Sequence, residues 1–411
     1  MVAVPSNPPR MPTLRFSPLA LLAGAAILLA PAAHAQKQYG PGVTDTEIKI
    51  GQTMVYSGPA SSFGIVGEVM RGYAAMVNDK GGIKGRKVTV LSYDDACSPP
   101  KTIEATRRLV ENDNVLGLFG STCTGSQIAV QKYLNGKQVP QFYTTGSGAT
   151  LFDPKGAPWT IPMSFYYELE GENYGRYIRQ AKPNAKIAIL FQNDDVGKSL
   201  IRGFKKGLGG EAVAATMVVK EASYEATDPT IDSQILVLKG SGADTFANFG
   251  VLKFATMALK KTQEIGWKPM QVIMTTSSSV PGVLAQAGPL KESVGLITGS
   301  WYKASSDPKW ANDEGVNAYK AFMKARLPGK EMDDAAAVHG YLVADLTFKL
   351  LERAGDNLTR ENLLKQATSM TNVELPMLLP GITVNASPDN YYVIRTAKMS
   401  RFDGTRWALV D

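Results

Sequence analysis

The sequence contains very little histidine and cysteine, and these shortages exclude several classes of enzyme. It has 2 histidines and 2 cysteines among 411 residues. His34 lies in an N-terminal segment that we expect to be removed, so a Ser-His-Asp triad would depend on His339 and a metal site of several histidines is excluded. Neither a G-x-S-x-G motif nor a nucleotide-binding P-loop is present. Composition therefore favours a binding protein over an enzyme, without a metal ion or cofactor.

Long hydrophobic runs are also missing. The longest, from Leu19 to Ala30, has 12 residues and is too short to span the roughly 30 Å of hydrocarbon in a bilayer. Arg10 and Arg15 precede this run, and Ala33-His34-Ala35 follows it as an A-x-A cleavage signal. We predict that residues 1–35 are a signal peptide cleaved after Ala35, so that the mature protein is exported without a membrane anchor.

The balance of charge excludes a nucleic-acid-binding surface. The sequence has 44 basic and 37 acidic residues, a formal net charge of +7, and the basic residues are scattered rather than clustered. In an exported chain, an even number of cysteines favours a disulfide, here between Cys97 and Cys123, over two buried free thiols.

Strand-like and helix-like segments alternate from Glu47 onward. The predicted strands of a first series cover residues 47–54, 87–94, 115–119 and 139–144, and those of a second series cover 186–191, 213–220, 243–249 and 271–276. Apolar residues at helical spacing predict helices over 65–79 and about 125–134, among others. This alternation predicts an α/β fold of two Rossmann-like lobes with parallel, doubly wound sheets.

Two loops rich in hydroxyl groups and glycine follow successive strands of the first series. One contains Thr122, Thr124 and Ser126, and the other covers residues 144–150. Such loops before helices can hold a carboxylate through N–H and O–H groups, although ordinary helix capping uses the same residues.

Phe63 and Tyr166 are candidates for the wall of a cleft, with burial in a core as the alternative. Asp94-Asp95 is best explained as a cap, because no third acid is placed nearby to complete a cation site.

Three stretches together resemble the leucine/isoleucine/valine-type periplasmic solute-binding proteins of ABC importers. They are SGP at 57–59 followed by Phe63-Gly64, NDKGGIKGRK at 78–87, and YDDAC at 93–97. The resemblance implies a type I periplasmic binding protein in which a three-segment hinge, near Pro162, Thr298 and Leu378, joins two lobes. It assigns residues 36–162 plus 299–377 to the N-terminal lobe and 163–298 plus 378–411 to the C-terminal lobe. It also implies a periplasmic location and a partner, a membrane permease driven by cytoplasmic ATPases.

The resemblance also implies roles for individual residues. Cys97 and Cys123 match the family's disulfide, and Thr124 matches a serine that binds the ligand carboxylate. The second carboxylate-binding loop corresponds to residues 147–150. The residues expected to contact ligand are Phe63, Thr124, Ser147, Ala149, Thr150, Tyr166, Thr276 and Tyr341.

The sequence departs from this family where amino-acid binders hold the ligand ammonium. Thr276 stands where they have an acid, and Val196 stands where a tyrosine is expected. Because a buried ammonium without a carboxylate partner costs several kcal/mol, the sequence predicts a small organic carboxylate lacking an α-amino group, with aromatic acids among the candidates. The alternatives are a branched-chain or other amino acid, and a receptor domain that senses its ligand rather than transporting it.

Overall fold

The computed structural model describes residues 1–3, 7–9, 11 and 37–410. Most of the predicted signal peptide, including residues 12–35 with the apolar run and the cleavage signal, lies outside these ranges. Met1–Lys37 and Gln38–Asp411 form separate units, and the fold concerns the second. Within the described residues, no helix combines the length and the apolar character that a bilayer crossing requires.

The first lobe is built on a parallel five-stranded sheet with the order β3-β2-β4-β5-β6. The inner strand β2 is buried along almost its whole length, as expected for a parallel sheet covered by helices on both faces. The strands are β2 Glu47–Met54, β3 Lys87–Asp94, β4 Leu118–Phe119, β5 Gln141–Thr144 and β6 Thr160–Pro162. A parallel pair, β1 Gln38–Tyr39 with β12 Asn357–Leu358, lies beside this sheet as a second, two-stranded one.

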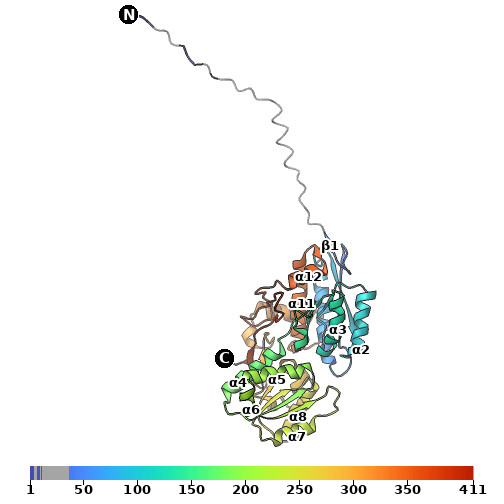
Figure 1. Cartoon of the computed structure of the whole chain (residues 1–411), viewed down its shortest axis with the longest axis vertical. Coiled ribbons are helices and arrows are strands. Elements are labelled where there is room, and N and C mark those ends of the chain that lie inside the picture. Colours follow the sequence, from blue (N-terminus) through green and yellow to red (C-terminus); the bar gives the residue numbers. More distant parts are fainter. Residues whose placement is uncertain (4–6, 10, 12–36, 411) are drawn as a thin grey trace. The chain divides into compact units, whose positions relative to one another are not determined.

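Helices from two distant parts of the sequence cover this sheet (Figure 1). Helix α11 is buried over most of its 20 residues because α1 packs along it and the sheet lies beneath it. Capping starts α11, since the Asp334 carboxylate accepts from the Ala336 N–H. The helices are α1 Ile65–Asp79, α2 Pro99–Arg107, α3 Thr124–Gly136, α10 Glu314–Arg326, α11 Ala335–Ala354 and α12 Arg360–Ala367.

The second lobe has a seven-stranded sheet with the order β14-β13-β11-β10-β9-β7-β8. Five strands are parallel, and the last two of the chain add an antiparallel edge. The strands are β7 Ile187–Gln192, β8 Val218–Tyr224, β9 Thr245–Phe249, β10 Met270–Ile273, β11 Ile297–Ser300, β13 Lys398–Phe402 and β14 Trp407–Leu409. The predicted fold class is confirmed, with the antiparallel edge as an addition.

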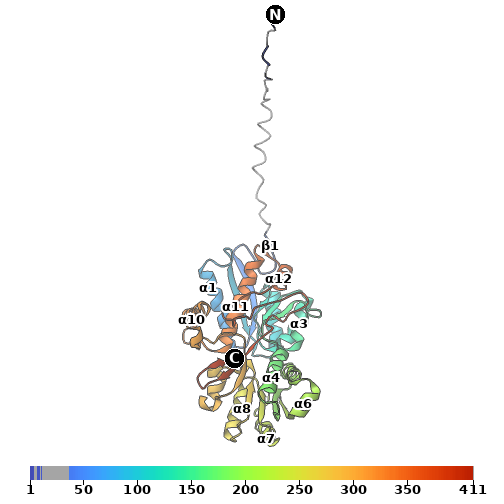
Figure 2. The same cartoon turned by 90° about the vertical axis from the view of Figure 1, so that its left-hand side faces the viewer.

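The helices of the second lobe lie on both faces of its sheet (Figure 2). Helices α4 and α5 pack closely because glycines on each of them, such as Gly171 and Gly203, face the backbone of the other helix. The helices are α4 Tyr167–Ala181, α5 Asp195–Leu208, α6 Glu211–Met217, α7 Asp232–Gly240, α8 Lys253–Glu264 and the short α9 Ala285–Ala287.

Three predicted strands are markedly shorter than expected: the one over 115–119 is present only at Leu118–Phe119, the one over 271–276 ends at Ile273, and the one over 213–220 begins as a helix. Residues 213–220 were expected to be extended, but α6 occupies residues up to Met217 and β8 begins only at Val218. Gly209, with a φ of 116°, ends α5 in the left-handed conformation, and an alanine-rich stretch then forms α6. Helix propensity therefore outweighs the few β-branched residues that suggested a strand.

The third passage of the chain between lobes lies later than the resemblance implies. Leu378, Val384 and Ile394 are all buried in the core of the first lobe. The chain joins the sheet of the second lobe only at β13, where Lys398 pairs with Ser300. Apolar side chains that continue beyond Leu378 keep the tail on the first lobe for about another sixteen residues.

Candidate functional site

A cavity of about 280 Å³ is lined by loops and helix ends from both lobes. The first lobe contributes the segments after β2, β4 and β5, and the second lobe contributes the ends of β7, β9 and β10 together with α4. These are carboxyl ends of parallel strands, where open α/β sheets bind ligands. The volume is at the small end for ligand pockets, so it suits a small molecule.

Hydroxyl groups and a helix start form the wall contributed by the first lobe. Thr124 is the first residue of α3 and lines the cavity together with Thr122, Ser126 and Thr145. Thr122 and Thr145 hydrogen bond to each other through their hydroxyls, which joins the two loops. The hydroxyl of Ser126 is buried without a hydrogen-bond partner among the described residues. This wall offers donors to an anion without a formal positive charge.

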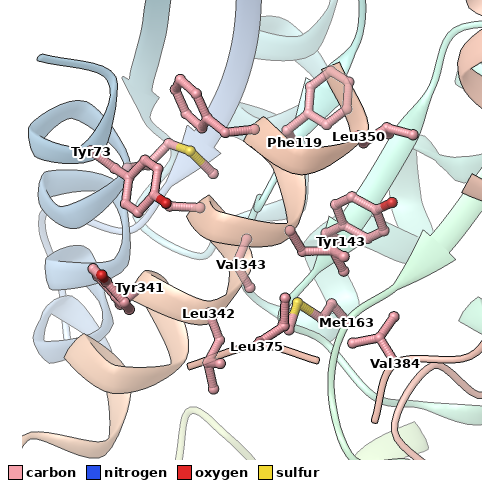
Figure 3. Packing of buried hydrophobic residues seen from close by; sticks show 14 of the residues in the cluster. Tyr73, Phe119, Tyr143, Met163, Tyr341, Leu342, Val343, Leu350, Leu375 and Val384 are labelled. Atoms are coloured by element: carbon pink, nitrogen blue, oxygen red, sulfur yellow. The ribbon is translucent and has the colours of Figure 1, made fainter. Parts of the chain in front are cut away.

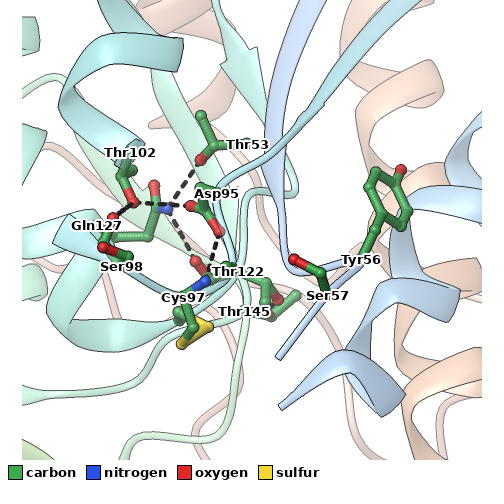
Figure 4. The surroundings of a disulfide bond; sticks show 12 residues. Thr53, Tyr56, Ser57, Asp95, Cys97, Ser98, Thr102, Thr122, Gln127 and Thr145 are labelled. Carbon is green, nitrogen blue, oxygen red and sulfur yellow. Dashed lines mark hydrogen bonds between the residues drawn. A yellow bond between two sulfur atoms is a disulfide. The ribbon is translucent and has the colours of Figure 1, made fainter. Parts of the chain in front are cut away.

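The disulfide between Cys97 and Cys123 forms an edge of the same wall (Figure 4). The two residues are 26 positions apart, with Cα atoms 5.6 Å from each other. Both have a positive φ, 59° and 70°, a conformation unusual for residues other than glycine. Asp95 fixes the loop before the bond, since its carboxylate accepts from the Cys97 N–H and the Thr102 hydroxyl. The predicted disulfide is present. Asp95 is not the cap of α2 that the sequence suggested, because Ser98 is the N-cap residue and no side chain caps the helix; Asp95 instead holds the turn before the helix.

The second lobe contributes an acid to the cavity. Glu170, on α4, lines the cavity and is 1% exposed. Its Oε1 accepts three hydrogen bonds, from the Thr275 N–H at 2.5 Å, the Thr275 hydroxyl at 2.6 Å and the Tyr174 hydroxyl at 2.6 Å. Burial raises the pKa of this carboxyl, while the same hydrogen bonds oppose the shift. Asp194 also lines the cavity, but it caps α5 by accepting from the N–H groups of residues 196 and 197.

His339 and Trp301 complete the lining near the passages between lobes. The two rings meet edge to face at 5.0 Å with an interplanar angle of 89°. The Nε2 atom of His339 lies 2.6 Å from the carbonyl oxygen of Met163. Burial lowers the pKa of this imidazole to about 4. No Lys or Arg is among the described residues that line the cavity, so its wall carries no fixed positive charge.

Three of the residues expected to contact ligand line the cavity, namely Phe63, Thr124 and Thr276. The Thr276 hydroxyl is buried without a hydrogen-bond partner among the described residues, as is that of Ser147, which lies just behind the lining. Ala149 begins a short 3-10 helix, η4 Ala149–Leu151, and its N–H points to the Ser199 hydroxyl of the second lobe at 3.4 Å. Thr150 is exposed to solvent. The second loop therefore meets the cavity at Thr145 and Gly146, slightly earlier than expected.

Two expected contact residues lie elsewhere, which corrects their assignment. Tyr166 stacks on Tyr392 with ring centroids 4.9 Å apart, and its hydroxyl bonds to Glu168. Tyr341 packs among aromatic residues between α1 and α11, with its ring 5.4 Å from that of Tyr73 (Figure 3). In both cases a neighbouring apolar cluster provides more contact than the cavity does.

A residue close in sequence to each of these two tyrosines lines the cavity in its place. Tyr167, one residue after Tyr166, lines the cavity, and so does His339, two residues before Tyr341. Glu170 was not anticipated at all. A signal for it exists in the sequence, since residues 167, 170 and 174 follow helical spacing and place an acid on an otherwise apolar stripe.

Comparison with known proteins agrees with this architecture. The family model described as periplasmic binding protein matches residues 47–401. The chain belongs to the periplasmic binding protein family. The Leu/Ile/Val-binding protein homolog 7 of Brucella abortus is 26% identical over 247 residues, which cover 57% of this chain and 60% of that relative. The match therefore spans less than two thirds of the length of the curated relative.

Solved structures of this periplasmic binding protein family share the fold. A branched chain amino acid ABC transporter protein from Thermus thermophilus with bound valine superposes with a TM-score of 0.79 and 15% identity, covering 90% of this chain and 96% of that one. A solute-binding protein of an ABC transporter from R. palustris in complex with benzoate gives a TM-score of 0.73 and 20% identity, covering 89% and 95%. At these identities the similarity establishes the fold and leaves the ligand open.

Proposed function

We propose that this chain is the periplasmic solute-binding component of an ABC importer and that it holds a small organic carboxylate in the cavity. The observation that carries the proposal is the wall of hydroxyl and N–H donors at Thr122, Thr124 and Ser126, facing a second lobe across a cavity of about 280 Å³. Hinge bending between the lobes would admit and release the ligand. The partners in this proposal are a membrane permease and its cytoplasmic ATPases.

The charge of the cavity bears on the choice between a plain carboxylate and an amino acid. The sequence argument assumed that no acid faces the ligand once Thr276 replaces the expected one, and Glu170 makes that premise wrong. Donors from Thr275 and Tyr174 already satisfy the inner oxygen of Glu170, and burial favours its neutral form. A carboxyl held in this way does not require a ligand cation. The carboxylate without an α-amino group therefore remains our proposal.

An α-amino acid is the second candidate, and Glu170 is the observation that favours it. An ionised Glu170 has no Lys or Arg near it in the described lining, so a ligand ammonium would be its natural partner. The reference relatives named above include one with bound valine and one with bound benzoate, so the fold accommodates both classes.

Calorimetry with matched ligands decides between the two. We expect 3-phenylpropionate, or another deaminated acid of suitable size, to bind at least roughly thirtyfold more tightly than its amino-acid counterpart, because losing a buried charge partner costs about 2–5 kcal/mol. The control is Glu170→Gln, which keeps an acceptor for Tyr174 but removes the charge. If the native protein binds the amino acid tightly and Glu170→Gln does not, the ligand is an α-amino acid and the second candidate is correct. Binding of neither class in a broad screen would refute the proposed function.

A further inference from the structure

His339 presents a ring to the cavity from the first turns of α11. Ala335, Ala336 and His339 all line the cavity, which is the spacing of one helical face. The two alanines leave room in front of the imidazole. No other titratable side chain of this helix is among the lining residues.

The hydrogen bond to Met163 fixes which ring nitrogen carries the proton. A carbonyl oxygen can only accept, so Nε2, 2.6 Å from the Met163 oxygen, must be the N–H donor. Burial keeps the ring neutral at ordinary pH, because it lowers the pKa of His339 to about 4. A neutral ring with its proton on Nε2 has a lone pair on Nδ1. Nδ1 is therefore a hydrogen-bond acceptor.

The orientation of this acceptor is held from two sides. Trp301 packs edge to face against the ring, and the bond to Met163 prevents the ring from rotating. Within the described part of the chain, the imidazole makes this one hydrogen bond, through Nε2, and nothing donates to Nδ1. A fixed acceptor without a donor, on a residue of the cavity wall, is available for a ligand.

We propose that Nδ1 of His339 accepts a hydrogen bond from a hydroxyl group of the ligand, so that the ligand class is a hydroxylated carboxylate. This inference rests on the proposed function, in which the hydroxyl loops hold the carboxylate. A ligand with a methyl group or an ether oxygen at this position would offer Nδ1 no hydrogen-bond donor, and sites built to hydrogen bond a hydroxyl reject analogues that lack it. His339 is thus a specificity residue.

The test uses matched carboxylates with the native protein. The panel contains benzoate, 3-phenylpropionate and hexanoate, each with its positional hydroxyl derivatives and the methyl ether of every hydroxyl compound. We expect a hydroxyl compound to bind most tightly by calorimetry and its methyl ether to bind roughly tenfold more weakly or worse. In His339→Phe, which keeps a ring against Trp301, the difference between hydroxyl and ether should disappear. Tyr341→Phe, on the same helix but directed into the core, is the matched control and should keep it.

Nitrogen-15 NMR of the native protein gives a readout that does not depend on a variant. The free protein should show His339 with its proton on Nε2, and the Nδ1 resonance should shift on binding the hydroxyl compound and not on binding its ether. The inference is overturned if the unsubstituted acid or the ether binds as tightly as the hydroxyl compound, if the preference survives in His339→Phe, or if Nδ1 is protonated. If only amino acids bind, this inference fails while a solute-binding function stands. If no compound binds, the proposed function fails first and this inference fails with it.

Discussion

Replacing Gly148 by alanine should weaken ligand binding by more than it destabilises the unliganded protein. Gly148 belongs to the second hydroxyl loop of the first lobe, and it faces Asp195 at the start of α5 in the second lobe. A Cβ at Gly148 would lie 2.8 Å from Thr124 Cγ2 and 2.9 Å from Asp195 Cγ, and nearer still to the Asp195 carboxylate. The backbone itself is no obstacle, because its φ of −68° and ψ of 153° suit any residue.

The size of the effect follows from these distances. Ordinary carbon contacts begin at 3.4 Å, so Asp195 Cγ must retreat by at least about 0.5 Å and Thr124 Cγ2 by about 0.6 Å. Overpacking of this kind costs about 1–3 kcal/mol, which is a factor of roughly 5 to 150 in Kd. The contact with Asp195 joins the two lobes, so its cost falls on the closed arrangement that holds the ligand, and an open protein avoids it by moving the lobes apart. The contact with Thr124 lies within the first lobe and is present in both states.

The assay is calorimetry with the tightest-binding acid of the panel, together with thermal unfolding of the unliganded protein. Gly136→Ala is the matched control, because a Cβ at Gly136 meets no atom within 4 Å. We expect this control to bind like the native protein. An unchanged Kd for Gly148→Ala, or a loss of thermal stability in the unliganded variant as large as the loss of affinity, would show that the contact does not govern closure.

Three further outcomes concern stability. Replacing Cys97 and Cys123 together by serine should lower the free energy of unfolding by about 3 kcal/mol in urea titrations, as expected for a loop of this length, and native protein should contain no free thiol by titration. Burial raises the pKa of Glu170, so the folded protein binds this proton more tightly than the unfolded chain does. The free energy of unfolding, compared with that of Glu170→Gln, should therefore fall as the pH rises through the raised pKa. A difference between the two proteins that is constant with pH would contradict this prediction. Tyr341→Ala should lower the free energy of unfolding by about 3–5 kcal/mol, because it removes a large side chain from the core. A loss of ligand affinity at unchanged stability would show instead that Tyr341 contacts the ligand.

Much of the fold follows from the sequence, because hydrophobic periodicity reports local structure directly. The ranges predicted for β2, β3 and α1 agree with the structure at both ends. The passage of the tail between lobes was harder to place, since it depends on which of two cores accepts Leu378 and the residues after it. That choice is made by packing between distant segments, and local pattern carries no information about it.

The site was predictable only in part, and for a geometrical reason. The loop with Thr124 follows a strand, so its position at the sheet edge is fixed by topology. On a helix, one residue corresponds to a rotation of about 100°, so an error of one position exchanges cavity for core. His339 and Tyr341 illustrate this on α11, since they are two positions apart and His339 lines the cavity, whereas Tyr341 packs in the core.

The interleaved connectivity of the two lobes has a consequence for how the chain acquires its structure after synthesis. The sheet of the first lobe begins with β2, but its core is filled by α11 and by residues up to Ile394. The second lobe gains its antiparallel edge only from β13 and β14, at the far end of the chain. The core of the first lobe can therefore be completed only when the last few dozen residues have been added, and contacts so distant in sequence form slowly. The two main buried clusters of the second lobe lie within residues 167–297, so the second lobe can assemble most of its core first although it begins later in the chain.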